Sequence, residues 1–294
     1  MLVERHANAV VAWAPAKVNL YLEILSRRPD SYHEIESLLV AVSLYDTLQF
    51  ENEPTGEIRL ECEEAGLPTG PGNLVYRAAS LLRAQSARKA GAAIRLQKRI
   101  PIAAGLAGGS SDAAATIAGL NELWHLGLST GQMMSVGAEL GSDVAFFFST
   151  PAAWCTGRGE VVTRLSLKYP LWFVLLCPPF GLATADVYRA TTVPDRVEDS
   201  SLFLSAARAG DVDEIGRRMH NRLQEAAEKL CPALRRYQAR LKSFGPAGQM
   251  MSGSGASLFA LCRNQEEAQA IARGLRVGSE EGMDQRVFIV RSCS

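Results

Sequence analysis

A glycine-rich run between a strand pattern and a small-residue helix constrains the fold of this chain more than any other segment. The run covers residues 101–115 and reads PIAAGLAGGSSDAAA. Its glycines, Gly105, Gly108 and Gly109, permit backbone torsions that other residues avoid, and they let a ligand approach the main chain closely. We therefore expect a strand before this loop, a helix after it, and a ligand held against the loop backbone.

We expect the helix to begin at Ser110 or Ser111 and to run to residue 125. The unpaired N–H groups and the positive dipole end of such a helix favour phosphate oxygens. The alanines at 113–115 keep the first turn slim, and either serine could offer its hydroxyl to a phosphate or to Mg²⁺. A tight strand-to-helix turn with a serine cap would show the same spacing, so both interpretations stay open.

Three common nucleotide-binding signatures do not fit this loop. No lysine follows the glycines, so the P-loop pattern G-x-x-x-x-G-K-[ST] is absent. The pattern G-x-G-x-x-G and a ribose-binding acid about 20 residues further on are also missing, which disfavours a Rossmann site. The protein-kinase signatures H-R-D and D-F-G do not occur.

The size and charge of the chain limit its organisation and partners. With 294 residues it exceeds one usual core, so we expect two domains, residues 1–160 and 161–294. Lys+Arg and Asp+Glu are both 31, and this balance indicates no nucleic-acid and no membrane partner. Six scattered cysteines without a CxxC motif indicate reduced thiols and a cytoplasmic protein. We expect a small-molecule substrate and a monomer or weak homodimer.

Strand and helix patterns alternate along the chain, which predicts an α+β architecture with mixed sheets. Helices are expected after Asn73, from the capping box of Ser129 and Gln132 to Gly141, and near 202–209, 211–229, 232–243 and 265–275. Residues 178–200 are expected to form mostly irregular loop. Strands are expected near 9–14, 18–25, 38–50, 57–62, 92–98, 152–156, 160–167, 171–177, 247–251, 256–263 and 286–291.

Two polar segments are candidates for catalysis. Lys17 and Asn19 stand two residues apart in PAKVNL, so they share one side of a strand, although a solvated strand face would look the same. Asp143 follows the helix-ending Gly141 and precedes an apolar run, where it either caps the next turn or forms a partly desolvated acid beside a cation. Phosphoryl transfer needs positioning, charge neutralisation and an acceptor for the hydroxyl proton, and Lys17 and Asp143 suit the last two roles.

Two further segments could hold a ligand. Tyr32 and His33 lie in the polar turn DSYHE, and an aromatic ring beside hydrogen-bonding groups can stack on a nucleobase. A second Gly/Ser loop, residues 251–257, contains Gly253 and Ser254 between two apolar runs. Either segment could equally be an ordinary surface turn.

Taken in order, these segments resemble the GHMP kinases, a superfamily of small-molecule kinases. The resemblance covers nearly the whole chain and rests on PAKVNL (15–20), SYH (31–33), PIAAGLAGGSSDA (101–113), LGSDV (140–144) and SGSGAS (252–257). PAKVNL together with D-x-Y-H is typical of the branch that phosphorylates the 2-hydroxyl of 4-CDP-2-C-methyl-D-erythritol with ATP and Mg²⁺, in the non-mevalonate route to isoprenoids. The resemblance implies an N-terminal domain like the second domain of ribosomal protein S5 and a ferredoxin-like C-terminal domain.

The resemblance also implies roles for single residues. Asp143 would be the general base, and Lys17 would orient Asp143 and the acceptor hydroxyl. The acceptor would be held by Asn19, Tyr32, His33, Thr184, Tyr188, Gly253 and Ser254, with Tyr188 closing over the cytosine. ATP would be bound by Pro101, Ile102, Ala103, Ala104, Gly105, Leu106, Ala107, Gly108, Gly109, Ser110 and Ser111 around its phosphates and by Asn73 and Lys98 near its adenine.

The sequence departs from the family pattern at a few positions. Ser31 stands where glycine usually precedes Tyr-His, and Ala107 replaces a glycine that is common in the loop. Arg222 and Gln224 stand in an N-x-L-x segment that often carries acids, and we assign no role there.

Three alternatives can be distinguished on these residues. Another GHMP kinase, acting on mevalonate, phosphomevalonate, homoserine or a sugar, would not need the cytidine-reading Tyr32, His33 and Tyr188. A non-catalytic nucleotide-binding regulator on the same fold could dispense with Lys17 and Asp143. A nucleotide-binding oxidoreductase is disfavoured by the loop spacing.

Overall fold

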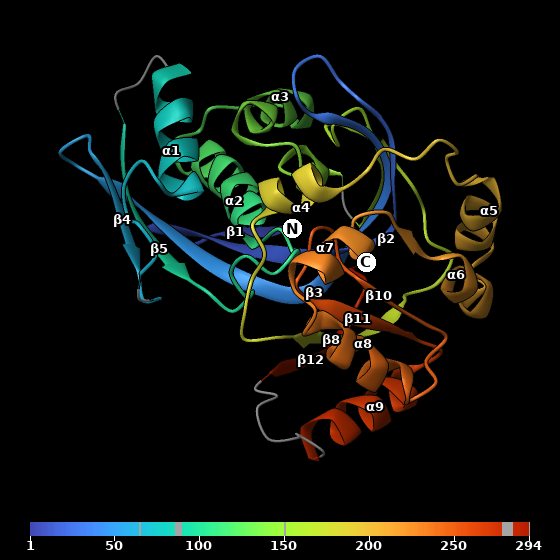
Figure 1. Ribbon diagram of the computed structural model, residues 1–294. Coiled ribbons are helices and arrows are strands. Elements are labelled where there is room, and N and C mark those ends of the chain that lie inside the picture. The colour runs from blue at the N-terminus through green and yellow to red at the C-terminus, as the bar shows by residue number, and fades with distance from the viewer. Residues whose placement is uncertain (65, 86–89, 150, 278–284, 294) are drawn as a thin grey trace. The chain divides into compact units, whose positions relative to one another are not determined.

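The chain divides into two compact units (Figure 1). The computed structural model describes residues 1–64, 66–85, 90–149, 151–277 and 285–293. Unit 1 comprises Met1–Ala16, Leu44–Ile100 and Ala107–Thr150, and unit 2 comprises Lys17–Ser43, Pro101–Leu106 and Pro151–Ser294. The long strands β2 (Ala9–Arg27) and β3 (His33–Glu53) each begin in one unit and end in the other, so the units interleave along the sequence. The domain boundary near residue 160 stays a prediction.

Unit 1 is a sheet with helices packed on it. The strand β1 (Leu2–Arg5) pairs with the start of β2, while the end of β3 pairs with β5 (Gly91–Gln97), which pairs in turn with β4 (Ile58–Cys62). The helices are α1 (Leu74–Gln85), α2 (Gly108–Leu123) and α3 (Thr130–Leu140), followed by the short 3₁₀ helix η1 (Ala145–Phe148). Helix α2 approaches β3 closely, because a Cβ atom at Gly119 would lie 2.4 Å from the Phe50 ring. The sequence did not predict β1, whose residues are mostly exposed.

Local signals set the helix starts of unit 1. The Asn73 Oδ1 atom accepts a hydrogen bond from the Val75 N–H at 2.9 Å, which caps α1. Ser129 and Gln132 form the predicted capping box of α3, and Gly141 is its C-cap. Both predictions are confirmed.

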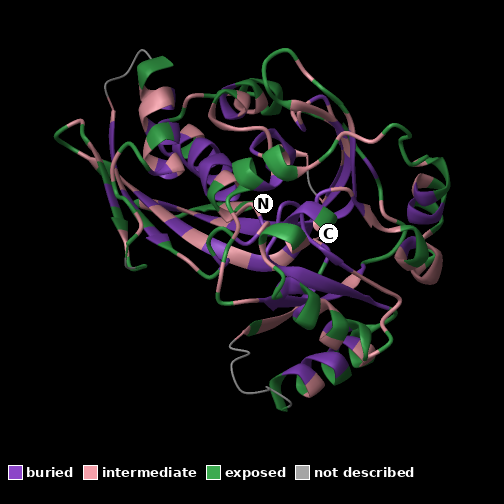
Figure 2. Cartoon of the chain, viewed as in Figure 1, coloured by how far each residue is buried: buried purple, intermediate pink, exposed green. Residues whose placement is uncertain are grey.

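Unit 2 contains a four-stranded antiparallel sheet with the order β10 (Gly248–Met251), β11 (Leu258–Cys262), β8 (Trp172–Cys177) and β12 (Arg286–Arg291). The chain forms β8, then helices, then β10 and β11, then α9 (Gln265–Val277), and finally β12. This order and connectivity are those of a ferredoxin-like fold, as the resemblance implied. Figure 2 shows that the central strands β8 and β11 are buried along most of their length.

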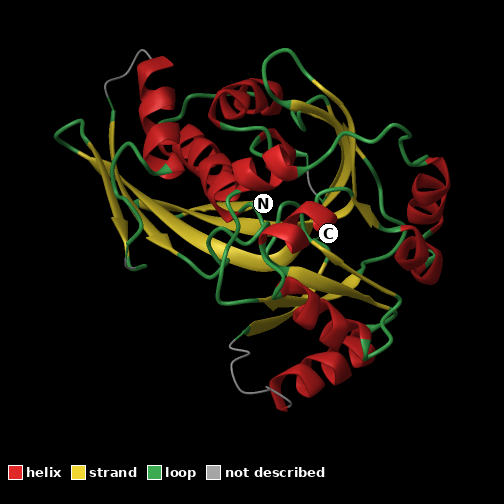
Figure 3. Cartoon of the chain, viewed as in Figure 1, coloured by secondary structure: helices red, strands yellow, loops and turns green. Residues whose placement is uncertain are grey.

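The rest of unit 2 contains the end of β2, the start of β3 and the strands that pair with them. It includes the strands β6 (Ala152–Thr156), β7 (Val161–Arg164) and β9 (His220–Asn221). Its other helices, shown in red in Figure 3, are α4 (Thr184–Ala190), α5 (Ser201–Ala209), α6 (Val212–Arg218), α7 (Gln224–Leu230) and α8 (Leu234–Lys242). No helix in the described part of the chain has the length and apolar character needed to cross a lipid bilayer.

One prediction about this region was confirmed and one was wrong. The segment 178–200 is mostly irregular, as expected, and its one helix is the short α4, which buries Val187 completely. The segment 211–229 is not one helix, because α6 ends at Arg218 and β9 follows, pairing in parallel with β2 at Tyr21 and Leu22. There the pairing with a distant strand outweighs the local pattern.

Candidate active site

Lys17 and Asn19 form a buried polar pair on β2. Each is only 4% exposed, which rules out a solvated strand face. The Lys17 Nζ atom donates hydrogen bonds to Asn19 Oδ1 at 2.6 Å and to the Gly105 carbonyl at 2.9 Å. The Asn19 Nδ2 atom donates to the Ser37 hydroxyl oxygen at 2.9 Å. A buried ammonium needs such partners, and this one is aimed at the first part of the glycine loop.

The second Gly/Ser loop lies beside this pair within unit 2. A Cβ atom at Gly253, where φ is +55°, would lie 3.0 Å from Lys17 Nζ and 3.1 Å from Asn19 Oδ1. The Ser252 hydroxyl donates to the Gly105 carbonyl at 3.0 Å. Gly105 has a φ of +73°, and its own Cβ would meet the Ser252 carbonyl oxygen at 2.1 Å, so only glycine fits there. Unit 2 therefore brings together the lysine, the asparagine and segments of both glycine loops.

The second part of the glycine loop opens α2 in unit 1. The helix begins at Gly108, before the predicted start at Ser110 or Ser111. Ser111 is fully buried, and its hydroxyl oxygen has no hydrogen-bond partner among the described residues. An unpaired buried hydroxyl at the first turn of a helix fits a phosphate or a phosphate-bound Mg²⁺. In the described part of the chain, no group of three or more His, Cys, Asp or Glu side chains could hold a metal ion.

A buried ion cluster joins the two sides of this loop in unit 1. Lys98, with a side chain only 6% exposed, forms ion pairs with Asp46 on β3 and, at 2.7 Å, with Asp112 on α2. The Asp46 Oδ1 atom also accepts hydrogen bonds from the backbone N–H groups of Arg99 and Ile100, at 2.6 and 2.9 Å. The residues before the loop and the first turn after it are thus fixed to one another. The role of Lys98 near adenine stays a prediction.

Burial sets the protonation of this cluster. It raises the pKa of Asp112 to about 8, opposed by the charge of Lys98 and reinforced by the nearby Asp46 carboxylate. Neither acid was predicted from the sequence. The available signal for Asp46 was a single carboxylate inside the apolar strand sequence SLYDTLQF.

Asp143 lies between α3 and η1 in unit 1 and is partly buried. It follows the C-cap Gly141, as the sequence indicated. Lys17 belongs to unit 2, so the pairing of these two groups stays a prediction.

The residues predicted to read a nucleobase lie near one another in unit 2. The ring centroids of His33 and Tyr188 are 5.5 Å apart. The Arg158 guanidinium lies 4.9 Å from the centroid of the Tyr32 ring, which remains half exposed. Burial, together with the charge of Arg27, lowers the pKa of His33, so its imidazole is neutral near pH 7 and can donate and accept one hydrogen bond each.

The hydroxyl groups of two further predicted acceptor-binding residues lie within hydrogen-bond distance of each other. The Thr184 Oγ1 and Ser254 Oγ atoms are 2.9 Å apart, so α4 and the second Gly/Ser loop are joined at this point. Both helix and loop belong to unit 2.

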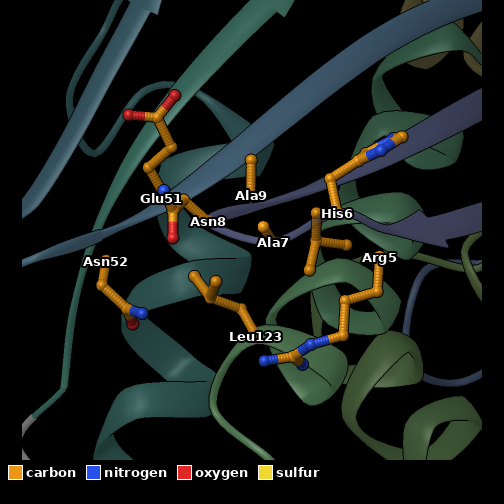
Figure 4. A pocket seen from close by; sticks show the side chains of 9 residues that line it. Arg5, His6, Ala7, Asn8, Ala9, Glu51, Asn52 and Leu123 are labelled. Atoms are coloured by element: carbon orange, nitrogen blue, oxygen red, sulfur yellow. The ribbon is translucent and has the colours of Figure 1, made fainter.

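A separate cavity of about 330 Å³ lies in unit 1 and contains none of the predicted site residues. Figure 4 shows the side chains around it, which come from β1, the turn after it, the start of β2, β3 and the end of α2. Arg5 is already held there by the Glu122 carbonyl at 2.6 Å and by the His125 ring at 2.9 Å.

Known proteins resemble the whole chain. The family model of the GHMP kinases N terminal domain matches residues 73–150, and the GHMP kinases C terminal model matches residues 203–278. The 4-diphosphocytidyl-2-C-methyl-D-erythritol kinase of Pelotomaculum thermopropionicum is 42% identical over 281 residues, which is 95% of this chain and 98% of the relative. The enzyme of the same name from Shouchella clausii is 40% identical over 279 residues, or 95% of this chain and 92% of the relative.

Solved structures show the same likeness. A 4-(cytidine 5'-diphospho)-2C-methyl-D-erythritol kinase has a TM-score of 0.80 and 33% identity, covering 97% of this chain and 100% of that chain. A homoserine kinase from Cytophaga hutchinsonii has a TM-score of 0.79 at 20% identity, covering 100% of this chain and 97% of that chain, and this second likeness concerns the fold alone.

Proposed function

Because this chain belongs to the GHMP kinase family, we propose that it transfers the terminal phosphoryl group of ATP to the 2-hydroxyl of 4-CDP-2-C-methyl-D-erythritol. The relatives named as kinases of this acceptor are about 40% identical over nearly the whole chain, which favours it over mevalonate, homoserine or a sugar. The observation that carries the chemistry is the buried Lys17–Asn19 pair, bonded to the carbonyl of Gly105 in the glycine loop. A regulator without catalysis would not need to bury an ammonium there.

The residues support a direct transfer. The acceptor oxygen bonds to the γ-phosphorus, the bond from phosphorus to the bridging oxygen breaks, and ADP leaves. Asp143 takes the hydroxyl proton, while Lys17 offsets the charge that develops on the transferred group. The first N–H groups of α2 and the Ser111 hydroxyl would hold the phosphates. Mg²⁺, when bound, neutralises phosphate charge and orients the transfer.

The acceptor is recognised through its base. Tyr32, His33 and Tyr188 supply an aromatic and hydrogen-bonding set suited to cytosine, and Thr184 with Ser254 stands beside it. Mevalonate and homoserine have no aromatic ring to occupy such a set. A cytoplasmic setting agrees with six cysteines that form no disulfide among the described residues.

An acceptor panel tests the proposal. The purified chain, with ATP and Mg²⁺, is given the cytidylyl acceptor, mevalonate or homoserine, and ADP release is followed. We expect turnover with the cytidylyl acceptor alone. Turnover with mevalonate or homoserine, and none with the cytidylyl compound, would reject the proposed acceptor.

Asp143→Asn examines the catalytic part of the proposal. Removing the proton acceptor should lower kcat roughly 10²–10⁴-fold. ATP affinity, measured by titration, should stay near that of the wild type, because the amide keeps the size of the carboxyl group. An unchanged kcat would remove Asp143 from the role of general base.

A further inference from the structure

We propose that Asn221 is a positioning residue for this reaction, which fixes the second Gly/Ser loop against Lys17 and Asn19. The inference rests on the proposed function, since Lys17 acts in the transfer. Asn221 is the first residue of the N-x-L-x segment, in which Arg222 and Gln224 stand where acids are common in the family.

The Asn221 side chain is buried and uses every hydrogen of its amide. Its Nδ2 atom donates to the carbonyl oxygens of Met251 and Gly253, both at 2.8 Å. Its Oδ1 atom accepts from the Leu223 N–H at 3.0 Å, so the same side chain also fixes the turn that precedes α7. The residue is only 8% exposed, and its bonds are therefore shielded from competing water.

The backbone of Asn221 is tied to the strand that carries the catalytic lysine. β9 pairs in parallel with β2 at Tyr21 and Leu22, and the Arg222 N–H donates to the Leu22 carbonyl at 2.9 Å. Arg222 also donates to both carboxylate oxygens of the fully buried Glu23 on β2, at 2.7 and 2.6 Å. The position from which Asn221 holds the loop is thus fixed relative to β2.

The held loop segment is the part nearest the catalytic pair. Both backbone polar groups of Met251 are hydrogen-bonded to side chains, because its N–H donates to Gln224 Oε1 at 3.0 Å while its carbonyl accepts from Asn221. Gly253, whose carbonyl Asn221 also holds, packs against the side chains of Lys17 and Asn19. A shift of the Gly253 carbonyl would remove the packing that orients the Lys17 side chain. Small misplacements of groups near the reacting atoms lower the reaction rate strongly.

The substitution Asn221→Asp tests the two hydrogen bonds that the Asn221 amide donates to the loop. A carboxylate keeps the shape and still accepts the Leu223 N–H, but it cannot donate to the two carbonyls. We expect kcat to fall roughly 10- to 100-fold. The KM for ATP should change by less than about twofold, because the loop holds no predicted ATP contact.

The pH profile separates positioning from a general loss of structure. A carboxyl group buried between two carbonyls binds a proton readily, and the protonated form can donate one hydrogen bond again. The kcat of Asn221→Asp relative to wild type should therefore rise as the pH is lowered from about 8 to about 6. The inference is overturned if the ratio of the variant kcat to the wild-type kcat does not change with pH. It is also overturned if the kcat of Asn221→Asp lies within about twofold of the wild-type value.

Asn121→Asp is the matched control. The Asn121 amide likewise accepts from a backbone N–H and donates to a carbonyl, both of Leu128, but it lies in unit 1 outside the predicted site. Its kcat should stay at the wild-type value. An equal loss of kcat in this control would show that the effect of Asn221→Asp is not specific.

A second variant decides the outcome if Asn221→Asp does not fold. Gln224→Met removes only the acceptor for the Met251 N–H, and it should lower kcat with little change in the KM for ATP. An unchanged kcat in a folded Gln224→Met variant then overturns the inference. All ratios are taken with whichever acceptor the wild type uses, so rejection of the cytidylyl acceptor leaves this test intact.

Discussion

Tyr32 has an exposed aromatic ring, and a cation lies over one face of this ring. Arg158 lies 4.9 Å from the ring centroid, and the residue is still 51% exposed, which leaves surface for a base to stack on. Tyr32→Ala should weaken binding of the cytidylyl acceptor by about 1–3 kcal/mol while ATP binding is unchanged. Isothermal titration with each ligand measures both.

Tyr169→Ala is the control for this variant. Tyr169 is also exposed in unit 2, with the Lys168 ammonium 5.2 Å from its ring, but it belongs to no predicted site. Acceptor binding should be unchanged in this control. If Tyr32→Ala weakened only ATP binding, the two pockets would have been assigned in reverse.

Both positions where the chain replaces a common family glycine have left-handed backbone. Ser31 has a φ of +68° and Ala107 a φ of +53°. An L-residue in this region is strained by about 1–2 kcal/mol, and glycine's extra freedom in the unfolded chain offsets part of the relief. Ala107→Gly should therefore raise the free energy of unfolding by about 0.5–1 kcal/mol.

Urea denaturation measures this change, with Ala118→Gly as the control. Ala118 lies inside α2, where glycine should instead lower the free energy of unfolding by about 1 kcal/mol. A loss of stability in Ala107→Gly would contradict the strain at that position.

Residues of the site differ in how readily the sequence reveals them. Lys17 and Asn19 could be paired in advance because two-residue spacing on a strand fixes a shared side. Asn221 could not, because its partners Met251 and Gly253 lie far along the chain and nothing local marks them. Asp46 and Asp112 were missed for the same reason, since Lys98 connects them only in the folded structure.

Among the elements, the loop before α2 depends on the buried Lys98 cluster. The pKa of Asp112 is raised from 3.8 to about 8, so between these values the folded chain holds a proton that the unfolded chain has lost. Stability from this group is therefore complete at low pH and falls as the pH rises toward 8. In Asp112→Asn, the free energy of unfolding should no longer contain this decrease with rising pH.

Urea denaturation at several pH values between about 6 and 8 tests this prediction. The wild type should lose more free energy of unfolding across the range than Asp112→Asn does. The exposed Asp195→Asn serves as a control and should keep the wild-type slope. Equal slopes in all three proteins would contradict a raised pKa for Asp112.

Elements with local signals were predicted well. The capping box of α3 and the Asn73 cap of α1 depend on neighbouring residues and hold in the structure. The break between α6 and α7 carries no glycine or proline and follows from pairing with β2, which the sequence does not reveal. Helix α4 escaped prediction because it is short and depends on burying Val187.

The molecule as a whole has no excess charge. Its formal net charge is zero and its isoelectric point is about 6.9, so repulsion between copies is weakest near neutral pH. We expect solubility in polyethylene glycol to be lowest near pH 7 and to rise on either side. A solubility that changes steadily across this range would show that a local patch, and not net charge, governs association.

The two units are completed at different times during synthesis. Every segment of unit 1 has been translated once the ribosome passes residue 150, whereas unit 2 still lacks all residues from Pro151 onward, including β12. That strand pairs with β8, and Cys293 beyond it donates its N–H to the Ala41 carbonyl on β3. Lys17 through Ser43 therefore emerge from the ribosome early and stay without these last partners until residue 293 has been translated, and apolar strands exposed in this way are prone to aggregation.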